Sequence, residues 1–527
     1  MKKILTIILD GFGYREEEYG NAIKAAQMNF FNKLWEEYPH SLLKASEEAV
    51  GLHEGQFGNS ETGHQTIGAG RLIKQNETLV NEFFTNRDGI LDNKAFNKLL
   101  ENKNKTIHLM GLCSDGNVHA GIDDIINMYE LLAKNSFKNI YFHIITDGRD
   151  TDMHSSYKYI GMLEEKIKEY KIGEIATICG RYYAMDRDKN YDRTKLYYEL
   201  VTKGVGIETN RIKDVINKMY DNDITDEFLR PVLVNRNGII KNGDILIWLN
   251  YRADRAKQII SSFTDNLFDG FHTYNMSNLE VYSFLPIDKS ISTITFLEEQ
   301  NITNPLGLYL SELGITQARI AETEKFPHVT YFFDGGFNGR IPKCNAFHIP
   351  SPEVATYDLK PEMSAVGVTK KCIECMVQDY DFILVNFANP DMVGHTGDFE
   401  ATIKACMAID MCLEKIIEQA NENFYKVIIL ADHGNADIML EESGNVVTTH
   451  TISKVPFIIL DKSVELVKEG DLTNVAPTIL EYMDIAIPEE MKDTKILFKN
   501  WLRYLTKFLY VKRGGNIGNL GLAKHKV

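Results

Sequence analysis

The chain has 527 residues, of which 44% are hydrophobic and 25% are charged, a composition typical of globular proteins. Its 74 acidic residues outnumber the 58 basic ones, and the formal net charge of −16 argues against a broad surface for nucleic acid or an anionic membrane. No stretch of about eighteen uncharged apolar residues occurs, so the sequence predicts no membrane span.

The N-terminus and the cysteines indicate the compartment. The first apolar run ends after Leu9, which is too short for the hydrophobic region of a signal peptide. Only Cys372 and Cys375 form a C-x-x-C pair, and no second pair follows at zinc spacing. We interpret the two as small apolar residues on one helical face rather than as a redox or zinc site. A reducing compartment, the cytoplasm, is therefore expected.

The first part of the chain contains two candidate functional residues, a carboxylate after a predicted strand and a serine in a glycine-rich stretch. A buried strand is predicted for Ile4 to Leu9, and Asp10 follows at its carboxyl end, where open α/β sheets bind ligands. A turn aspartate that caps the next element is the alternative. A helix is predicted for 22–38. The stretch Gly58 to His64 then sets Ser60 among glycines, without a G-x-S-x-G elbow; a simple turn is the alternative.

Alternation of strands and helices continues from about residue 76 to about residue 290. Four apolar runs, each predicted to be a strand, end in polar clusters: 107–112, 140–146, 175–179 and 245–250. Arginine pairs bidentately with carboxylates and phosphates, so its repeated placement at strand ends predicts one crevice for a small polyanion. For a single arginine, a surface ion pair is the commoner role. The residues concerned are His119, Arg149, Asp150, Arg181, Arg187, Arg252 and Arg255, of which the last two are predicted to lie on the first turn of a helix.

The last third of the chain repeats the pattern with metal-ligating residue types. Strands are predicted for 382–387, 427–430 and 455–460, and an isolated Lys325 precedes them in a turn-prone run. A lone histidine is more often structural than a ligand, but these histidines stand beside aspartates at successive strand ends. Nitrogen and oxygen donors without thiolates suit Mn²⁺, Zn²⁺ or Mg²⁺, and two such groups fit a two-metal centre that activates a serine for phosphoryl transfer. The donors are Asp391, His395, Asp432, His433 and His450.

From residue 499 to residue 527 the sequence is basic and contains no acidic residue. Apolar residues at helical spacing, beginning with Trp501, predict a C-terminal helix packed on the body of the protein and followed by a glycine-rich end. A basic amphipathic contact with a membrane or a partner is the alternative.

Ten motifs follow one another along the chain: Asp10 to Gly13, Gly58 to His64, Ser114 to His119, Gly148 to Asp150, Gly180 to Asp188, Arg252 to Arg255, Glu322 to His328, Asn389 to Gly397, Asp432 to Asn435 and Thr449 to Thr451. This ordered series resembles the cofactor-independent (2,3-bisphosphoglycerate-independent) phosphoglycerate mutases of the alkaline phosphatase superfamily. The resemblance extends from the N-terminus to about Lys499.

The resemblance implies an α/β fold with an alkaline-phosphatase-like, metal-binding domain formed by both chain ends, 1–75 and 300–498. A second α/β domain for the phosphotransferase substrate, 76–299, is inserted between them. Two divalent metal ions, usually Mn²⁺ in this family, are implied. One would be held by Asp391, His395 and His450, and the other by Asp10, Ser60, Asp432 and His433. The implied substrate contacts are His119, Arg149, Asp150, Arg181, Arg187, Arg252, Arg255 and Lys325.

The implied activity is the interconversion of 3-phosphoglycerate and 2-phosphoglycerate in glycolysis, through a phosphoserine at Ser60 and without 2,3-bisphosphoglycerate. Lys325 would neutralise developing charge, and Asp150 or His119 would shuttle a proton. The protein is expected to be a monomer whose partners are 3-phosphoglycerate and 2-phosphoglycerate. The alternatives are a metal-dependent phosphomonoesterase or phosphopentomutase of the same superfamily, and a metal-binding scaffold without turnover. Five arginines favour a carboxylate-bearing substrate, and therefore the mutase.

Overall fold

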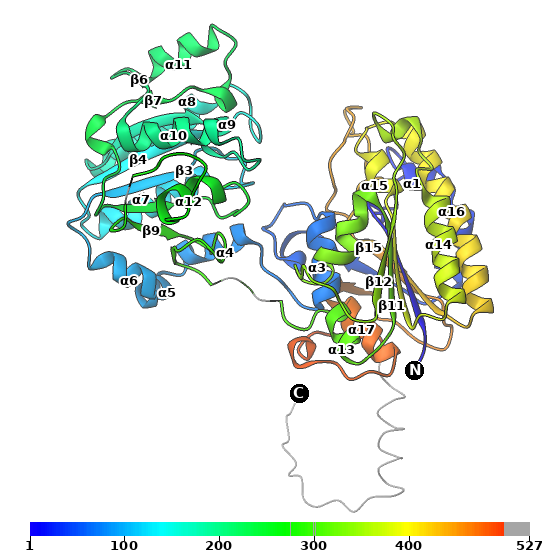
Figure 1. Ribbon diagram of the computed structural model, residues 1–527. Coiled ribbons are helices and arrows are strands. Elements are labelled where there is room, and N and C mark those ends of the chain that lie inside the picture. The colour runs from blue at the N-terminus through cyan, green and yellow to red at the C-terminus, as the bar shows by residue number, and fades with distance from the viewer. Residues whose placement is uncertain (275, 299, 301, 500–527) are drawn as a thin grey trace, which may run out of the picture. The chain divides into compact units, whose positions relative to one another are not determined.

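The computed structural model describes residues 1–274, 276–298, 300 and 302–499 (Figure 1). The chain divides into two units: unit 1 is Met1–Ile73 together with the chain from residue 301 on, and unit 2 is Lys74–Gln300. Each unit contains an eight-stranded sheet among its described residues. The predicted tail lies outside the described residues, apart from Lys499.

The sheet of unit 1 has the strand order β12-β11-β13-β1-β14-β15-β2-β16. Neighbours from β12 to β14 run parallel, β15 is antiparallel to both β14 and β2, and β16 is parallel to β2. The strands are β1 (Ile4–Leu9), β2 (His40–Lys44), β11 (Gln317–Glu322), β12 (Cys344–Ile349), β13 (Phe382–Phe387), β14 (Lys426–Leu430), β15 (Val455–Ile459) and β16 (Glu469–Asp471).

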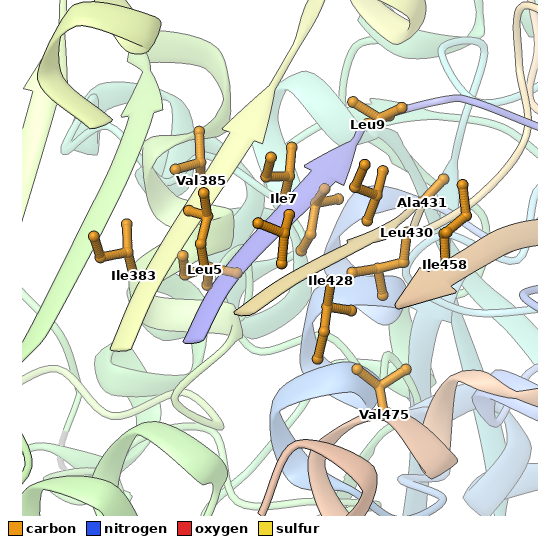
Figure 2. Packing of buried hydrophobic residues seen from close by; sticks show 14 of the residues in the cluster. Leu5, Ile7, Leu9, Ile383, Val385, Ile428, Leu430, Ala431, Ile458 and Val475 are labelled. Atoms are coloured by element: carbon orange, nitrogen blue, oxygen red, sulfur yellow. The ribbon is translucent and has the colours of Figure 1, made fainter. Parts of the chain in front are cut away.

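The centre of this sheet is built from both ends of the chain. β1 lies between β13 and β14, and its six side chains are all buried. Continuous apolar runs of this kind are typical of parallel strands that are covered on both faces. Figure 2 shows Leu5, Ile7 and Leu9 packed among side chains of β13 and β14. Because Leu9 pairs with Phe387 and Ile8 with Leu430, the carboxyl ends of the three strands lie at one edge.

Helices cover both faces of the unit 1 sheet (Figure 1). On one face α16 contacts α1, α2 and α14, and on the other α3 contacts α13 and α17. The predicted single helix over 22–38 is wrong, because Gln27 has a φ of 47°, a left-handed conformation that a continuous helix does not contain. The helices are α1 (Ala22–Ala25), α2 (Asn29–Glu37), α3 (Ser60–Ala69), α13 (Leu306–Glu312), α14 (Ala365–Val377), α15 (Asn389–Gly394), α16 (Phe399–Glu422) and α17 (Val475–Tyr482).

Unit 2 has the strand order β10-β9-β8-β3-β4-β5-β7-β6, parallel throughout except between β5 and β7. Ile107 and Leu109 of β3 belong to one apolar core, whereas Met110 and Leu112 belong to another. This alternation shows that both faces of the sheet are buried. The strands are β3 (Ile107–Leu112), β4 (Ile140–Thr146), β5 (Glu174–Gly180), β6 (Ile207–Glu208), β7 (Val232–Leu233), β8 (Ile245–Trp248), β9 (Glu280–Ser283) and β10 (Ile294–Thr295).

The helices of unit 2 divide between its two cores. Side chains of α7 and α8 belong to the core that contains Ile107, and side chains of α10 and α12 belong to the core that contains Met110. The helices are α4 (Asn76–Thr85), α5 (Arg87–Asp92), α6 (Lys94–Leu100), α7 (Ile122–Lys134), α8 (Ser156–Tyr170), α9 (Arg181–Ala184), α10 (Tyr191–Lys203), α11 (Ile212–Tyr220) and α12 (Lys257–Thr264).

The α/β fold class is confirmed, with two local corrections. β8 ends at Trp248 rather than at residue 250, and α12 begins at Lys257. Arg252 and Arg255 therefore lie in the connection before the helix and not on its first turn. Cys372 and Cys375 are free thiols buried on α14, which confirms their interpretation as apolar packing residues. Within the described part of the chain, no helix is long and apolar enough to cross a membrane.

Candidate active site

Four polar residues of unit 1 meet at the carboxyl edge of its parallel strands. Asp10 directly follows β1, Asp432 follows β14, and Asp391 lies on α15 just after β13. Lys325 ends the short 3-10 turn η4 (Thr323–Lys325) that follows β11. All four side chains are buried. Because the register aligns these strand ends, residues hundreds of positions apart in the sequence converge on one volume.

Ser60 is the first residue of α3 rather than part of a simple turn. Asn59 caps the helix, since its side-chain oxygen accepts the backbone N–H of Thr62 at 3.0 Å. A Cβ on Gly63 would lie 2.7 Å from the carbonyl oxygen of Asp432, so only glycine lets α3 approach this strand end so closely. The Ser60 hydroxyl is thereby held at a helix N-terminus, where the peptide dipoles favour negative charge.

The Ser60 oxygen has polar neighbours on three sides. Its Oγ lies 3.0 Å from Asp10 Oδ1 and 2.9 Å from His433 Nε2, and Lys325 Nζ donates to it at 2.5 Å. Lys325 Nζ also lies 2.7 Å from Asp10 Oδ1 and 2.6 Å from Asp391 Oδ2. One buried ammonium group thus joins the serine to two carboxylates.

Charge pairing outweighs burial at these groups. Burial alone would lower the pKa of Lys325, but Asp10 and Asp391 raise it above its ordinary value. Burial alone would raise the pKa values of Asp10 and Asp391, yet the Lys325 charge holds both below the usual range. The lysine is therefore protonated and the two carboxyl groups are ionised at neutral pH.

Three histidines complete the cluster in unit 1. Burial would lower the pKa of His433, but Asp432 and Asp391 raise it to about 9. His395 Nε2 and His450 Nε2 lie 3.2 and 3.3 Å from Asp391 Oδ1, and 3.0 Å from each other. The structure therefore brings together Ser60 and all six other residues that the sequence analysis marked as metal ligands.

The donor set fits divalent cations. Two atoms bound to one ion at about 2.1 Å and at right angles are about 3.0 Å apart, close to the His395, His450 and Asp391 separations. Two groups have ligand atoms within 4.8 Å of one another: Asp391, His433 and His450, and Asp10, His64 and Asp432. Asp432 Oδ2 is buried and accepts no hydrogen bond from the described residues; its ion-pair contacts are His64 Nδ1 at 3.2 Å and His433 Nε2 at 3.5 Å, so the oxygen can still bind a cation.

A second polar cluster lies in unit 2, at the carboxyl ends of the neighbouring strands β8, β3, β4 and β5. Asp254 Oδ2 accepts a hydrogen bond from Arg187 Nη1 at 2.7 Å, and its Oδ1 lies 3.4 Å from Arg252 Nε and 3.8 Å from His119 Nδ1. Burial and the charge of Arg181 lower the pKa of His119 to about 4, so its imidazole is neutral at pH 7. We refer to this set as the arginine cluster: His119, Arg149, Asp150, Arg181, Arg187, Arg252 and Arg255.

Asp147 is a buried carboxylate that contacts several residues of the arginine cluster without belonging to it. Arg181 Nη1 donates to its Oδ1 at 2.7 Å and also to Asp150. Ser114 Oγ donates to its Oδ2 at 2.6 Å. At the margin of the cluster, Arg149 is half exposed beside Glu227, and Arg255 donates to the carbonyl oxygen of Met185 at 3.0 Å. All the predicted substrate residues except Lys325, which lies in unit 1, are thus gathered here.

Comparisons with known proteins identify the family of the chain. Residues 2–487 match the family model of the metalloenzyme superfamily. The 2,3-bisphosphoglycerate-independent phosphoglycerate mutase of Clostridioides difficile is 42% identical over 94% of this chain and 99% of its own length. The chain belongs to this mutase family. The family member of Prochlorococcus marinus is 40% identical over 94% of each chain.

A solved structure of similar fold extends the match. The crystal structure of Leishmania mexicana phosphoglycerate mutase at low cobalt concentration is 28% identical to this chain. It covers 94% of this chain and 97% of its own, with a TM-score of 0.69. The α/β fold is thus shared with a solved phosphoglycerate mutase, and the match to the metalloenzyme superfamily supports the use of divalent metal ions.

Sequence reasoning missed several residues of this family member's site. His64 and Asn386 contact Asp10 and Asp432 in unit 1, and Asp147 and Asp254 support the arginines in unit 2. Asn386 was detectable as the one polar residue of the otherwise apolar run of β13. The other three stand within or beside the motifs already singled out, but nothing in their local pattern indicates which arginine or carboxylate each contacts.

Proposed function

We propose that this chain interconverts 3-phosphoglycerate and 2-phosphoglycerate in glycolysis, without 2,3-bisphosphoglycerate, through a phosphoserine at Ser60. The observation that carries the proposal is the Ser60 hydroxyl, fixed at the N-terminus of α3 within 3.0 Å of Asp10, His433 and Lys325 in a member of the mutase family. A serine needs such activation because its unassisted hydroxyl is a poor nucleophile.

Two divalent ions, Mn²⁺ by preference, complete the proposed site. Asp391, His395 and His450 would hold one ion, and Asp10, Ser60, Asp432 and His433 the other. When bound, the ions supply Lewis-acid activation of the serine and stabilise charge on the phosphoryl group. The close separations among these donors support the assignment, as does the buried Asp432 Oδ2, which accepts no hydrogen bond in the described part of the chain.

The chain's own residues account for the transfer. The Ser60 hydroxyl releases its proton to solvent on activation, and Oγ then attacks phosphorus in line, which breaks the bond to the glycerate oxygen and forms phosphoserine; the same Oγ is the leaving group of the return step. Lys325 Nζ, held by Asp10 and Asp391, offsets the negative charge that develops at the serine oxygen and the phosphoryl group. Asp150, with His119 as the alternative, would give a proton to the leaving oxygen and take one from the other hydroxyl in the return step.

The arginine cluster of unit 2 would hold glycerate while its phosphoryl group is on Ser60. Arginine forks bind a carboxylate bidentately, and a retained glycerate makes the protein a mutase rather than a phosphatase. We accordingly assign metal binding to unit 1, near the expected 1–75 and 300–498, and substrate binding to unit 2, near the expected 76–299. Because one chain supplies all these groups, we propose a monomer that acts in the cytoplasm, where glycolysis runs.

The test is formation of 2-phosphoglycerate from 3-phosphoglycerate with Mn²⁺ and no added bisphosphoglycerate. Ser60→Ala should abolish it, because the variant lacks the hydroxyl that attacks phosphorus. Ser41→Ala is the matched control, since Ser41 is equally buried in unit 1 but donates only to the carbonyl oxygen of Val467. A Ser60→Ala protein with wild-type turnover would refute the phosphoserine route.

A further inference from the structure

Asn386 is a buried amide in the middle of the unit 1 core. It lies on β13 opposite Ile8 of β1 and is fully buried. Its Nδ2 donates to Asp10 Oδ2 at 2.7 Å and lies 3.1 Å from His64 Nε2. The opposite amide orientation would set a carbonyl oxygen against the Asp10 carboxylate, where two acceptors would repel each other. The amide nitrogen therefore faces both groups.

The Asn386 amide fixes the tautomer of His64. An amide N–H can only donate, so His64 Nε2 must be the acceptor and the imidazole proton lies on Nδ1. His64 Nδ1 accordingly donates to the backbone carbonyl oxygen of Ser60, 2.9 Å away, and lies 3.2 Å from Asp432 Oδ2. A protonated nitrogen has no free lone pair for a metal. His64 is thus close to the ligand atoms of Asp10 and Asp432 without being able to bind an ion through Nδ1.

We propose that Asn386 and His64 are positioning residues that set the geometry of the ion site formed by Asp10, Ser60, Asp432 and His433. They form a continuous bridge from the Asp10 carboxylate through the amide and the imidazole to the backbone of Ser60. The inference rests on the two-ion site proposed above. We call this arrangement the Asn386–His64 bridge.

The bridge restrains two movements that would otherwise change the geometry of the ion site: rotation of the Asp10 carboxylate and displacement of the first turn of α3. With Oδ2 tied to Asn386, the Asp10 carboxylate cannot rotate, and its Oδ1 stays 3.0 Å from Ser60 Oγ. The bond from His64 holds the first turn of α3 beside Asp432, whose Oδ2 is left without a hydrogen-bond partner in the described part of the chain. Loss of such outer contacts typically weakens metal binding by about 10- to 100-fold.

The first experiment measures Mn²⁺ binding by calorimetry without substrate. We expect wild type to bind two ions, and Asn386→Ala to bind one of them about 10- to 100-fold more weakly. The ion held by Asp391, His395 and His450 should keep its affinity, which also reports that unit 1 is folded. Asn21→Ala is the matched control, because Asn21 is as buried as Asn386 but donates only to carbonyl oxygens of Arg15 and Glu17.

The second experiment separates a positioning role from a ligand role. His64→Asn keeps an N–H donor near the Nδ1 position, whereas His64→Gln places its amide near Nε2 and cannot reach the Ser60 carbonyl in the same way. Each variant breaks one link of the bridge, so we expect both to keep two ions and to bind one of them about 10- to 100-fold more weakly than wild type, as Asn386→Ala does.

Three outcomes would overturn the assignment. If Asn386→Ala binds two ions with wild-type affinity, the positioning role of the bridge is refuted and the proposed function is unaffected. Complete loss of one ion in both His64 variants, as expected for Asp432→Asn, would make His64 a ligand. A wild-type protein that binds fewer than two ions would refute the two-ion site of the proposed function and the bridge with it.

Discussion

Asp147→Asn should weaken substrate binding with no change to the metal site. Asp147 accepts hydrogen bonds from Ser114 Oγ at 2.6 Å and from Arg181 Nη1 at 2.7 Å, and also from the backbone N–H groups of Arg149 and Asp150 at 3.2 and 3.0 Å. Burial alone would raise its pKa, but Ser114, the Asp150 N–H and Arg181 lower it, so the group is ionised at neutral pH. The variant keeps the shape of the side chain and removes the charge.

The expected loss follows from the contact to Arg181. A hydrogen bond to a charged group contributes about 1.5–3 kcal/mol, and one to a neutral group contributes about 0.5–1.5 kcal/mol. The amide oxygen of the variant still accepts from Arg181, so the loss is the difference of about 1–1.5 kcal/mol, and the buried guanidinium keeps one ionic partner, Asp150. At about 1.4 kcal/mol per factor of ten, kcat/KM should fall by about 5- to 12-fold. The fall should appear mainly in KM, because Arg181 binds the ground state and the transition state alike.

The assay is steady-state formation of 2-phosphoglycerate, with Mn²⁺ affinity measured in parallel. Asp334→Asn is the matched control: Asp334 is a buried aspartate 3.6 Å from the buried Arg319 of unit 1, apart from both clusters. We expect this control to keep the wild-type KM. An Asp147→Asn protein with unchanged KM would refute the reasoning that Asp147 orders the arginine cluster.

Three further predictions concern retention, pH and metal. Arg252→Ala should raise the release of inorganic phosphate relative to 2-phosphoglycerate, because glycerate then leaves before the return transfer; unchanged partitioning would contradict this. Burial raises the pKa of Glu322 from 4.5 to about 7, so the folded state retains a proton that the unfolded state loses. The free energy of unfolding should therefore fall as the pH rises from 4.5 to about 7. Glu322→Gln should raise this free energy by up to about 3 kcal/mol at pH 8, with a higher thermal midpoint, and should leave both unchanged at pH 4. Equal midpoint shifts at both pH values would refute this linkage. Chelation should abolish turnover and lower the midpoint, since ions that bind only the folded state contribute about 2.7 kcal/mol at a hundred times their Kd; a chelated protein that keeps its turnover would contradict the metal requirement.

Local pattern was sufficient for the elements that carry the site. The apolar runs of β1, β3, β4 and β13 have the bounds that the sequence predicts, because a buried parallel strand must be apolar on both faces. The polar residues after these runs were identified for the same reason, since a strand end is where the chain leaves the core. Asp10 is an example, directly after Leu9.

Propensity alone failed where packing or backbone conformation overrides it. The helix predicted over 22–38 is interrupted at Gln27, and α12 begins two residues after Arg255. Both errors concern boundaries, which depend on the direction in which the chain must continue rather than on apolar periodicity.

The sequence by itself determined that carboxylates, imidazoles and arginines stand at the ends of buried strands. Only the tertiary structure decided which of them meet, because neighbours in a parallel sheet come from remote parts of the chain. Lys325 is an isolated residue in a turn-prone run, yet its Nζ lies 2.5 Å from the oxygen of a serine 265 positions away. Asn386 and His64 likewise acquire their roles from the alignment of β13 with β1 and the approach of α3, which no local pattern encodes.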